Sequence, residues 1–93
     1  MEITYDPAKD ARNIDLRDLP FARAAALDWE TAWIREDARN DYGETRFLVL
    51  AHLEERLHVL CFTPTRDGIR VISFRKANSR EEGAYEKQKA ADG

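Results

Sequence analysis

Five side chains able to do acid–base or phosphate chemistry lie where an apolar run meets a polar, helix-forming segment. Arg70, Arg75 and Lys76 belong to the apolar run, and Glu81 and Tyr85 follow in the polar segment. Cleavage of RNA without a metal needs a base for the 2′-hydroxyl, cations for the phosphate and a proton for the leaving 5′-oxygen. Arginine suits the phosphate, Glu81 or Lys76 could be the base, and Tyr85 could orient or donate.

Local geometry decides whether these groups can meet. Side chains alternate along a strand, so Arg70 and Arg75 point to opposite faces unless a bulge intervenes, whereas Arg70 and Lys76 share a face. Glu81 and Tyr85 are four residues apart and lie on one face of a helix. A second interpretation stays open, because a capped helix start with structural ion pairs has the same residue types.

The other reactive residues suggest no metal or cofactor site. His52 and His58 flank a predicted hairpin turn and could face each other, but two histidines without further ligands make a poor metal site, so we expect partly buried or rim histidines. Cys61 is the only cysteine and is expected to pack as a small hydrophobic residue. Trp29 and Trp33 are expected to be core or interface anchors rather than a base-stacking platform, because an acidic segment follows them.

Charge is unevenly distributed along the 93 residues. The net charge is −3, yet residues 66–93 hold 7 basic and 5 acidic residues whereas residues 1–65 hold 8 and 13. A local basic patch can attract RNA although the whole chain is acidic. No segment approaches the ~20 apolar residues that cross a bilayer, and no signal-peptide pattern is present, so we expect a cytoplasmic protein without membrane contact.

Helix signals stand at both ends of the chain. Asp6 and Pro7 predict a helix start after a short strand, because aspartate caps helices and proline suits the first helical position. The Ala-rich "FARAAALDW" predicts a second helix by propensity. Ser79 and Glu82 fit a capping box and predict a closing helix through "SREEGAYEKQKA".

Strand signals fill the middle of the chain. A strand is expected around Trp33 and Ile34. Three further β-type runs, "RFLVLAHL", "RLHVLCFT" and "IRVISFRK", are separated by short turns and predict an antiparallel meander. We therefore expect one α+β domain over residues 1–93, with a small curled antiparallel sheet, two N-terminal helices and a C-terminal helix.

Short motifs in a fixed order resemble a known family. The resemblance runs from Tyr5 to about Tyr85 and includes "DPAK", Asn13, "YGETR" and "FTPTRDGIRVIS", followed by Arg80 and Glu81. The chain resembles the BrnT toxins of bacterial type II toxin–antitoxin modules. This resemblance implies a RelE-like fold and an RNA-cleaving enzyme that slows translation without a cofactor. It also implies a BrnA-like ribbon–helix–helix antitoxin as partner, with operator DNA bound only through that antitoxin.

The resemblance also implies a set of site residues. By position, the active-site group comprises Arg46, Arg66, Arg70, Arg75, Lys76, Glu81 and Tyr85. We expect Arg70, Arg75, Lys76, Glu81 and Tyr85 to serve catalysis, and Arg17, Arg46, Arg66 and Arg80 to bind RNA.

One stretch departs from the family pattern. Leu16, Arg17 and Asp18 stand where the resemblance leads us to expect Lys, His and Gly. Arg17 could hold a phosphate but cannot replace a histidine as a base, because its pKa stays above ~12. This departure suggests an alternative function. The chain would then be a catalytically weakened or inactive homologue that acts as an antitoxin-binding, regulatory module. Phe74 also replaces a small residue and is expected to crowd its strand or leave apolar surface for a partner.

Overall fold

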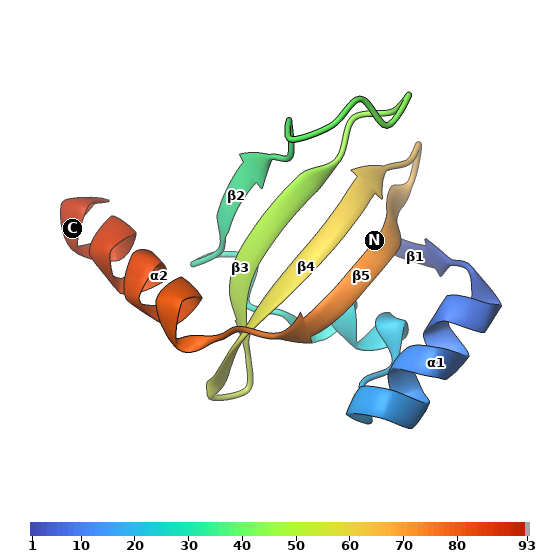
Figure 1. Cartoon of the computed structure of the whole chain (residues 1–93), viewed down its shortest axis with the longest axis horizontal. Helices are drawn as coiled ribbons and strands as arrows, with labels where there is room; N and C mark the ends of the chain where they lie inside the picture. The colour runs from blue at the N-terminus through green and yellow to red at the C-terminus, as the bar shows by residue number, and fades with distance from the viewer. Residues whose placement is uncertain (93) are drawn as a thin grey trace.

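A five-stranded sheet organises the fold in the computed structural model, which describes residues 1–92 (Figure 1). The strand order is β1-β5-β4-β3-β2. Along the chain the elements are β1 (Glu2–Tyr5), α1 (Pro7–Arg17), η1 (Phe21–Ala26), β2 (Trp33–Glu36), β3 (Phe47–Leu53), β4 (Arg56–Pro64), β5 (Gly68–Lys76) and α2 (Ser79–Asp92). Strands β2 to β5 pair antiparallel, which confirms the predicted meander.

The sheet is mixed, so the prediction of a purely antiparallel sheet was wrong. β1 lies parallel to β5, with Glu2 opposite Gly68. A side chain at Gly68 would collide with the backbone of Glu2, so glycine permits this close approach. The Glu2 N–H also donates to the Asp67 carbonyl at 3.1 Å. The missed pairing joins segments more than sixty residues apart in the sequence, which local strand signals do not encode.

Helix α1 begins and ends where its sequence dictates. The Asp6 carboxylate accepts a hydrogen bond from the Ala8 N–H at 2.9 Å, and Pro7 occupies the first turn, as predicted. Asp18 ends the helix with a φ of 53°, and its N–H donates to the Ile14 carbonyl. Aspartate tolerates this left-handed conformation better than most residues, although glycine favours it more.

The predicted second helix is present as a short 3₁₀-helix, η1, which ends before the last three residues of the predicted segment. Its two buried side chains, Phe21 and Ala24, are three residues apart, which matches the 3₁₀ repeat. Pro20 precedes it without a side-chain cap, although the Phe21 N–H donates to the Asp10 carboxylate at 2.8 Å. Because the segment buries only these two side chains, it ends after two turns, and the backbone of Leu27 is extended.

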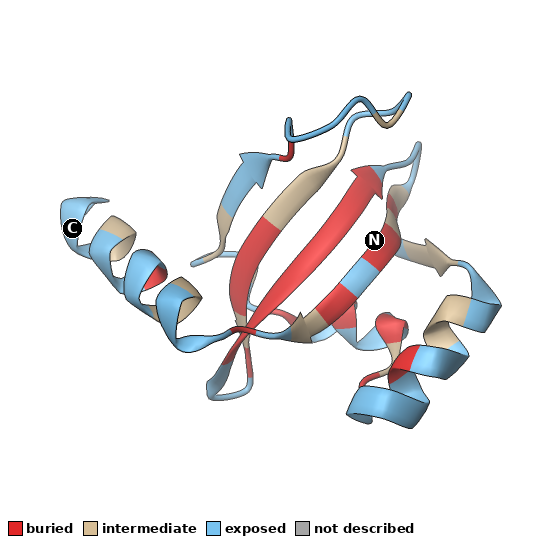
Figure 2. Cartoon of the chain, viewed as in Figure 1, coloured by how far each residue is buried: buried red, intermediate tan, exposed pale blue. Residues whose placement is uncertain are grey.

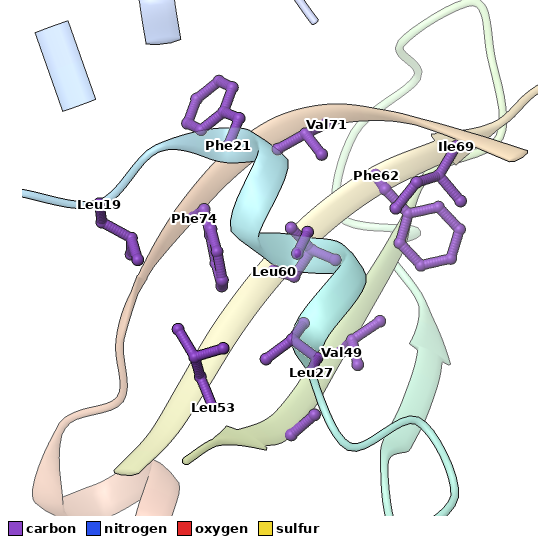
Figure 3. Close-up of a cluster of buried hydrophobic side chains, with 12 residues drawn as sticks. Leu19, Phe21, Leu27, Val49, Leu53, Leu60, Phe62, Ile69, Val71 and Phe74 are labelled. Carbon is purple, nitrogen blue, oxygen red and sulfur yellow. The ribbon is translucent and has the colours of Figure 1, made fainter. Parts of the chain in front are cut away.

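The main core lies between η1 and one face of the sheet, which we call the core face (Figure 3). Phe74 is 1 % exposed and is one of the largest fully buried side chains. The expectation that Phe74 crowds its strand or stays uncovered was therefore wrong, because it fills the centre of this core. The cluster comprises Leu19, Phe21, Ala24, Leu27, Val49, Ala51, Leu53, Leu60, Phe62, Ile69, Val71 and Phe74.

A smaller cluster holds α2 against the opposite face of the sheet, which we call the α2 face. It contains Leu50, Leu57, Val59, Ala77 and Tyr85. Tyr85 is the only buried residue among those described in α2, and the helix is otherwise mostly exposed (Figure 2). The face beside this cluster is left open to form a cleft. Among the described residues, no helix is both long and apolar enough to span a membrane.

Candidate active site

A β-bulge in β5 changes which side chains share a face. Cys61 of β4 pairs with Ser73, but its neighbour Phe62 pairs with Val71, so Ile72 is an extra residue in β5. Such a bulge shifts the alternation of side chains by one position.

The bulge brings two predicted site arginines to the same face. Val71 and Phe74 are three apart yet both point into the core, so Arg70 and Arg75 both point to the α2 face. Strand alternation predicted opposite faces for Arg70 and Arg75 unless a bulge intervened, and the bulge is present. Lys76 follows Arg75 and points to the core face instead, so the prediction that Arg70 and Lys76 share a face was wrong.

Arg75 and Glu81 form a bidentate ion pair at the junction of β5 and α2. The two guanidinium nitrogens donate to the two carboxylate oxygens at 2.9 and 2.8 Å. Glu81 also accepts from the Asn78 N–H at 2.9 Å, and Asn78 accepts from the Glu81 N–H at 2.9 Å. The capping box is therefore Asn78 with Glu81, which corrects the predicted pair of Ser79 and Glu82. The hydrogen bonds from Arg75 lower the pKa of Glu81, so the carboxylate stays ionised.

Beside this pair, the open part of the α2 face forms a cleft of about 510 Å³, which we call the arginine cleft. Its lining contains five arginines but only two carboxylates, Asp37 and Glu81, so its surface is cationic. Apolar side chains of β3 and β4 form its floor. The arginines are Arg35, Arg39, Arg46, Arg75 and Arg80.

The loop between β2 and β3 builds one wall of the cleft around a buried carboxylate. Asp37 has a side chain only 1 % exposed and accepts from Arg39 at 2.8 Å twice and from the Tyr42 hydroxyl at 3.2 Å. These bonds, led by the one from Arg39, hold the pKa of the Asp37 carboxyl well below its usual range. The Arg46 guanidinium lies 4.0 Å from the centre of the Tyr42 ring.

Of this wall only Arg46 was predicted as a site residue, because the segment is acidic by composition. The acidity is neutralised locally, since Asp37 is paired with Arg39 and Glu44 bridges Arg46 at 3.0 Å and Arg70 at 2.9 Å. The mixed charges of "REDAR" could have indicated this pairing, because opposite charges two residues apart can pair in a loop.

Tyr85 lies under α2 with its hydroxyl engaged. The hydroxyl donates to the Thr31 carbonyl at 2.8 Å, and the ring makes an edge contact with His52 at 5.4 Å between centroids. The side chain is 5 % exposed. Of the two predicted roles for Tyr85, orienting other groups fits this geometry, whereas proton donation would require the hydroxyl to leave Thr31.

Two predicted site residues line a different cavity. Arg17 and Lys76 lie in a groove of about 1030 Å³ between the end of α1 and the β3–β4 hairpin, on the core side of β5. Arg75 reaches the edge of both cavities. Arg66 lies apart from both, with a side chain 95 % exposed beside Asp67 in the β4–β5 turn.

The histidines and the cysteine occupy packed positions. His52 and His58 lie on opposite faces of the sheet, so they do not face each other across the hairpin. His58 packs on Phe74, and burial lowers the pKa of its imidazole. Cys61 is buried, which raises the pKa of its thiol. Within residues 1–92, no group of three or more His, Cys, Asp or Glu side chains could hold a metal ion.

Comparison with known proteins identifies the family. A family model described as the ribonuclease toxin BrnT of type II toxin–antitoxin systems matches residues 5–81. No curated protein and no solved structure gives a significant match. The family match spans strands β2 to β5, all five arginines of the cleft and the Arg75–Glu81 pair. This chain belongs to the BrnT family of ribonuclease toxins of type II toxin–antitoxin systems.

Proposed function

We propose that this protein is a metal-independent endoribonuclease that inhibits translation and is neutralised by a ribbon–helix–helix antitoxin. The observation that carries this proposal is the Arg75–Glu81 pair at the edge of the arginine cleft. The pair places a rigid guanidinium beside an unpaired cation, Arg80, for which no carboxylate partner exists within ion-pair distance in residues 1–92.

In this proposal the scissile phosphate binds Arg75 and Arg80. The 2′-oxygen attacks phosphorus to form a 2′,3′-cyclic phosphate, and the bond from phosphorus to the 5′-oxygen breaks. Glu81 accepts the 2′-hydroxyl proton, and water donates a proton to the leaving 5′-oxygen. Because its lowered pKa makes Glu81 a weak base, most of the rate enhancement comes from the arginines, which stabilise the charge that develops on the phosphate.

The remaining predicted residues take supporting roles in this proposal. Arg46 and Arg70, held in place by Glu44, contact phosphates flanking the scissile one. Tyr85 is a positioning residue that fixes α2, and therefore Glu81, against the sheet. Lys76 and Arg17 contact RNA only if the strand reaches the groove on the other side of β5. Arg66 gives at most a distant electrostatic contribution, because it is fully exposed in a turn.

The test is cleavage of RNA and inhibition of translation in a cell-free extract. The wild-type protein should do both, and the double variant Arg75→Ala, Glu81→Ala should lose roughly 100-fold or more, as when one group that stabilises a transition state is removed. Arg12→Ala is the control, because Arg12 is an exposed arginine of α1 that lines neither the cleft nor the groove that holds Lys76. Equal inhibition by the wild type and the double variant would refute the site.

A second candidate function is an inactive homologue that binds an antitoxin. The observation that favours it is that both cleft carboxylates, Asp37 and Glu81, are fully engaged by arginines, so neither is free to act as a base. The double substitution Leu16→Lys, Arg17→His discriminates between the two. Growth inhibition only in that variant supports the inactive homologue, whereas the nuclease proposal predicts inhibition by the natural protein.

A further inference from the structure

We infer that the arginine cleft binds one unpaired nucleobase, stacked on the guanidinium of Arg35, so that the substrate is single-stranded RNA. This inference rests on the proposed function for the identity of the ligand. It assigns a role to Arg35 and Trp33, which had no part in the predicted site.

Arg35 is positioned over the ring of Trp33. Its guanidinium carbon lies 4.4 Å from the centre of the Trp33 ring, so the indole holds one side of the guanidinium. Trp33 is half-buried and packs against the cluster under α2, which fixes the ring. Within residues 1–92 no carboxylate forms an ion pair with Arg35, and the two carboxylates of the cleft, Asp37 and Glu81, are paired with other arginines. Arg35 is therefore held in place by stacking and keeps its charge free.

The floor of the cleft is apolar. Leu48 is half-buried, and Leu50, Val59 and Cys61 lie beneath it, so the floor is apolar and offers no partner for an ion. An apolar floor below a planar cation suits the flat face of a base, since RNA-binding proteins stack unpaired bases on aromatic rings and arginine planes. The volume of about 510 Å³ falls in the range of sites for one small ligand.

The cleft is lined by further cations besides Arg35. A nucleotide whose base enters the cleft leaves its phosphates outside, and Arg46, Arg75 and Arg80 of the lining can contact them. Arg46 is supported by Tyr42, and the guanidinium of Arg75 is fixed by Glu81. A base-paired nucleotide cannot enter in this way, because its faces are covered by the neighbouring pairs. The cleft therefore selects unpaired RNA by shape and places its phosphate at the Arg75–Glu81 pair.

The test measures binding of a short single-stranded RNA whose 2′-oxygens are methylated, which blocks the proposed attack by the 2′-oxygen. We expect the same oligonucleotide in a duplex to bind at least about tenfold more weakly. Arg35→Lys keeps the charge but loses the stacking plane, and it should weaken single-strand binding by about 5- to 100-fold. The dependence of binding on salt should keep its slope, because the number of cations is unchanged. Arg12→Lys is the matched control, because Arg12 is exposed on α1 and does not line the cleft, and it should bind as the wild type does.

Two results would overturn the inference: Arg35→Lys binding single strands as tightly as the wild type, or the duplex binding as tightly as the single strand. Either result leaves the proposed nuclease standing if RNA is still cut at a site dependent on Arg75. Conversely, Arg35-dependent binding without any cleavage of unmodified RNA would support the inference and refute the proposed catalysis.

Discussion

Asn13 of α1 makes two buried hydrogen bonds, one of which reaches β5, and its replacement by alanine should cost a large part of the stability of the protein. The side-chain amide donates to the Leu19 carbonyl at 2.8 Å and to the Phe74 carbonyl at 2.9 Å. Its oxygen accepts from Arg17 at 3.2 Å, in a partly exposed position. The residue is 7 % exposed, so water does not easily replace the lost donors.

The magnitude follows from the two carbonyls left without a partner. Each buried acceptor that loses its donor costs about 1–3 kcal/mol, so Asn13→Ala should lower the free energy of unfolding by roughly 2–6 kcal/mol. For a domain of this size each kcal/mol corresponds to a Tm change of roughly 4–8 °C, so we expect a fall of at least about 8 °C. Urea denaturation followed by circular dichroism measures the change as a shift in the midpoint at constant slope.

Two controls separate the hydrogen bonds from other effects of the substitution. Arg17→Ala removes only the exposed third bond and should cost at most about 0.5 kcal/mol. Asn13→Asp keeps the size but turns both donors into acceptors, so it should be at least as destabilising as the alanine variant at neutral pH. The reasoning is wrong if Asn13→Ala is as stable as Arg17→Ala, or if Asn13→Asp is tolerated.

Three further predictions concern the sheet edge, the cleft wall and α2. Gly68→Ala should lower the free energy of unfolding by about 1–3 kcal/mol, because β1 must move away at Glu2; an unchanged urea midpoint would contradict this. The pKa of Asp37 is lowered in the folded state, so the ionised carboxylate stabilises the protein above pH 3.8, its ordinary pKa, and this stabilisation is lost as the pH falls below 3.8. Asp37→Asn should weaken this acid dependence in a pH series of thermal melts. Tyr85→Phe should lose about 0.5–1.5 kcal/mol with the bond to Thr31 but keep RNA cleavage, and a folded variant without cleavage would instead make the hydroxyl a catalytic group.

Short-range signals predicted much of the secondary structure correctly. The cap at Asp6 and the apolar runs of the meander depend on neighbouring residues, and the structure contains both. The closing helix was also predicted, but its cap was placed one residue late. Asn78 with Glu81 and Ser79 with Glu82 fit a capping box equally well in the sequence, and Arg75 on β5 favours the first because it binds Glu81.

The candidate site was less predictable, because its geometry depends on long-range pairing. Arg70 and Arg75 share a face only because β4 and β5 pair around the extra residue Ile72. Arg35 was overlooked because its surroundings are acidic by composition, and only the folded loop shows the carboxylates paired with other arginines. Strand alternation placed Lys76 on the face of Arg70, but the bulge between them puts the two side chains on opposite faces.

The sequence by itself determined the family, the meander and the presence of arginines near the end of β5, because these follow from local residue order. Tertiary structure alone decided the parallel pairing of β1, the bulge and the closing of the loop around Asp37. The physical reason is that strand register and buried ion pairs depend on which distant backbones and side chains meet. Those contacts gather Arg35, Arg39, Arg46, Arg75 and Arg80 into one cleft on the α2 face and turn Lys76 to the core face.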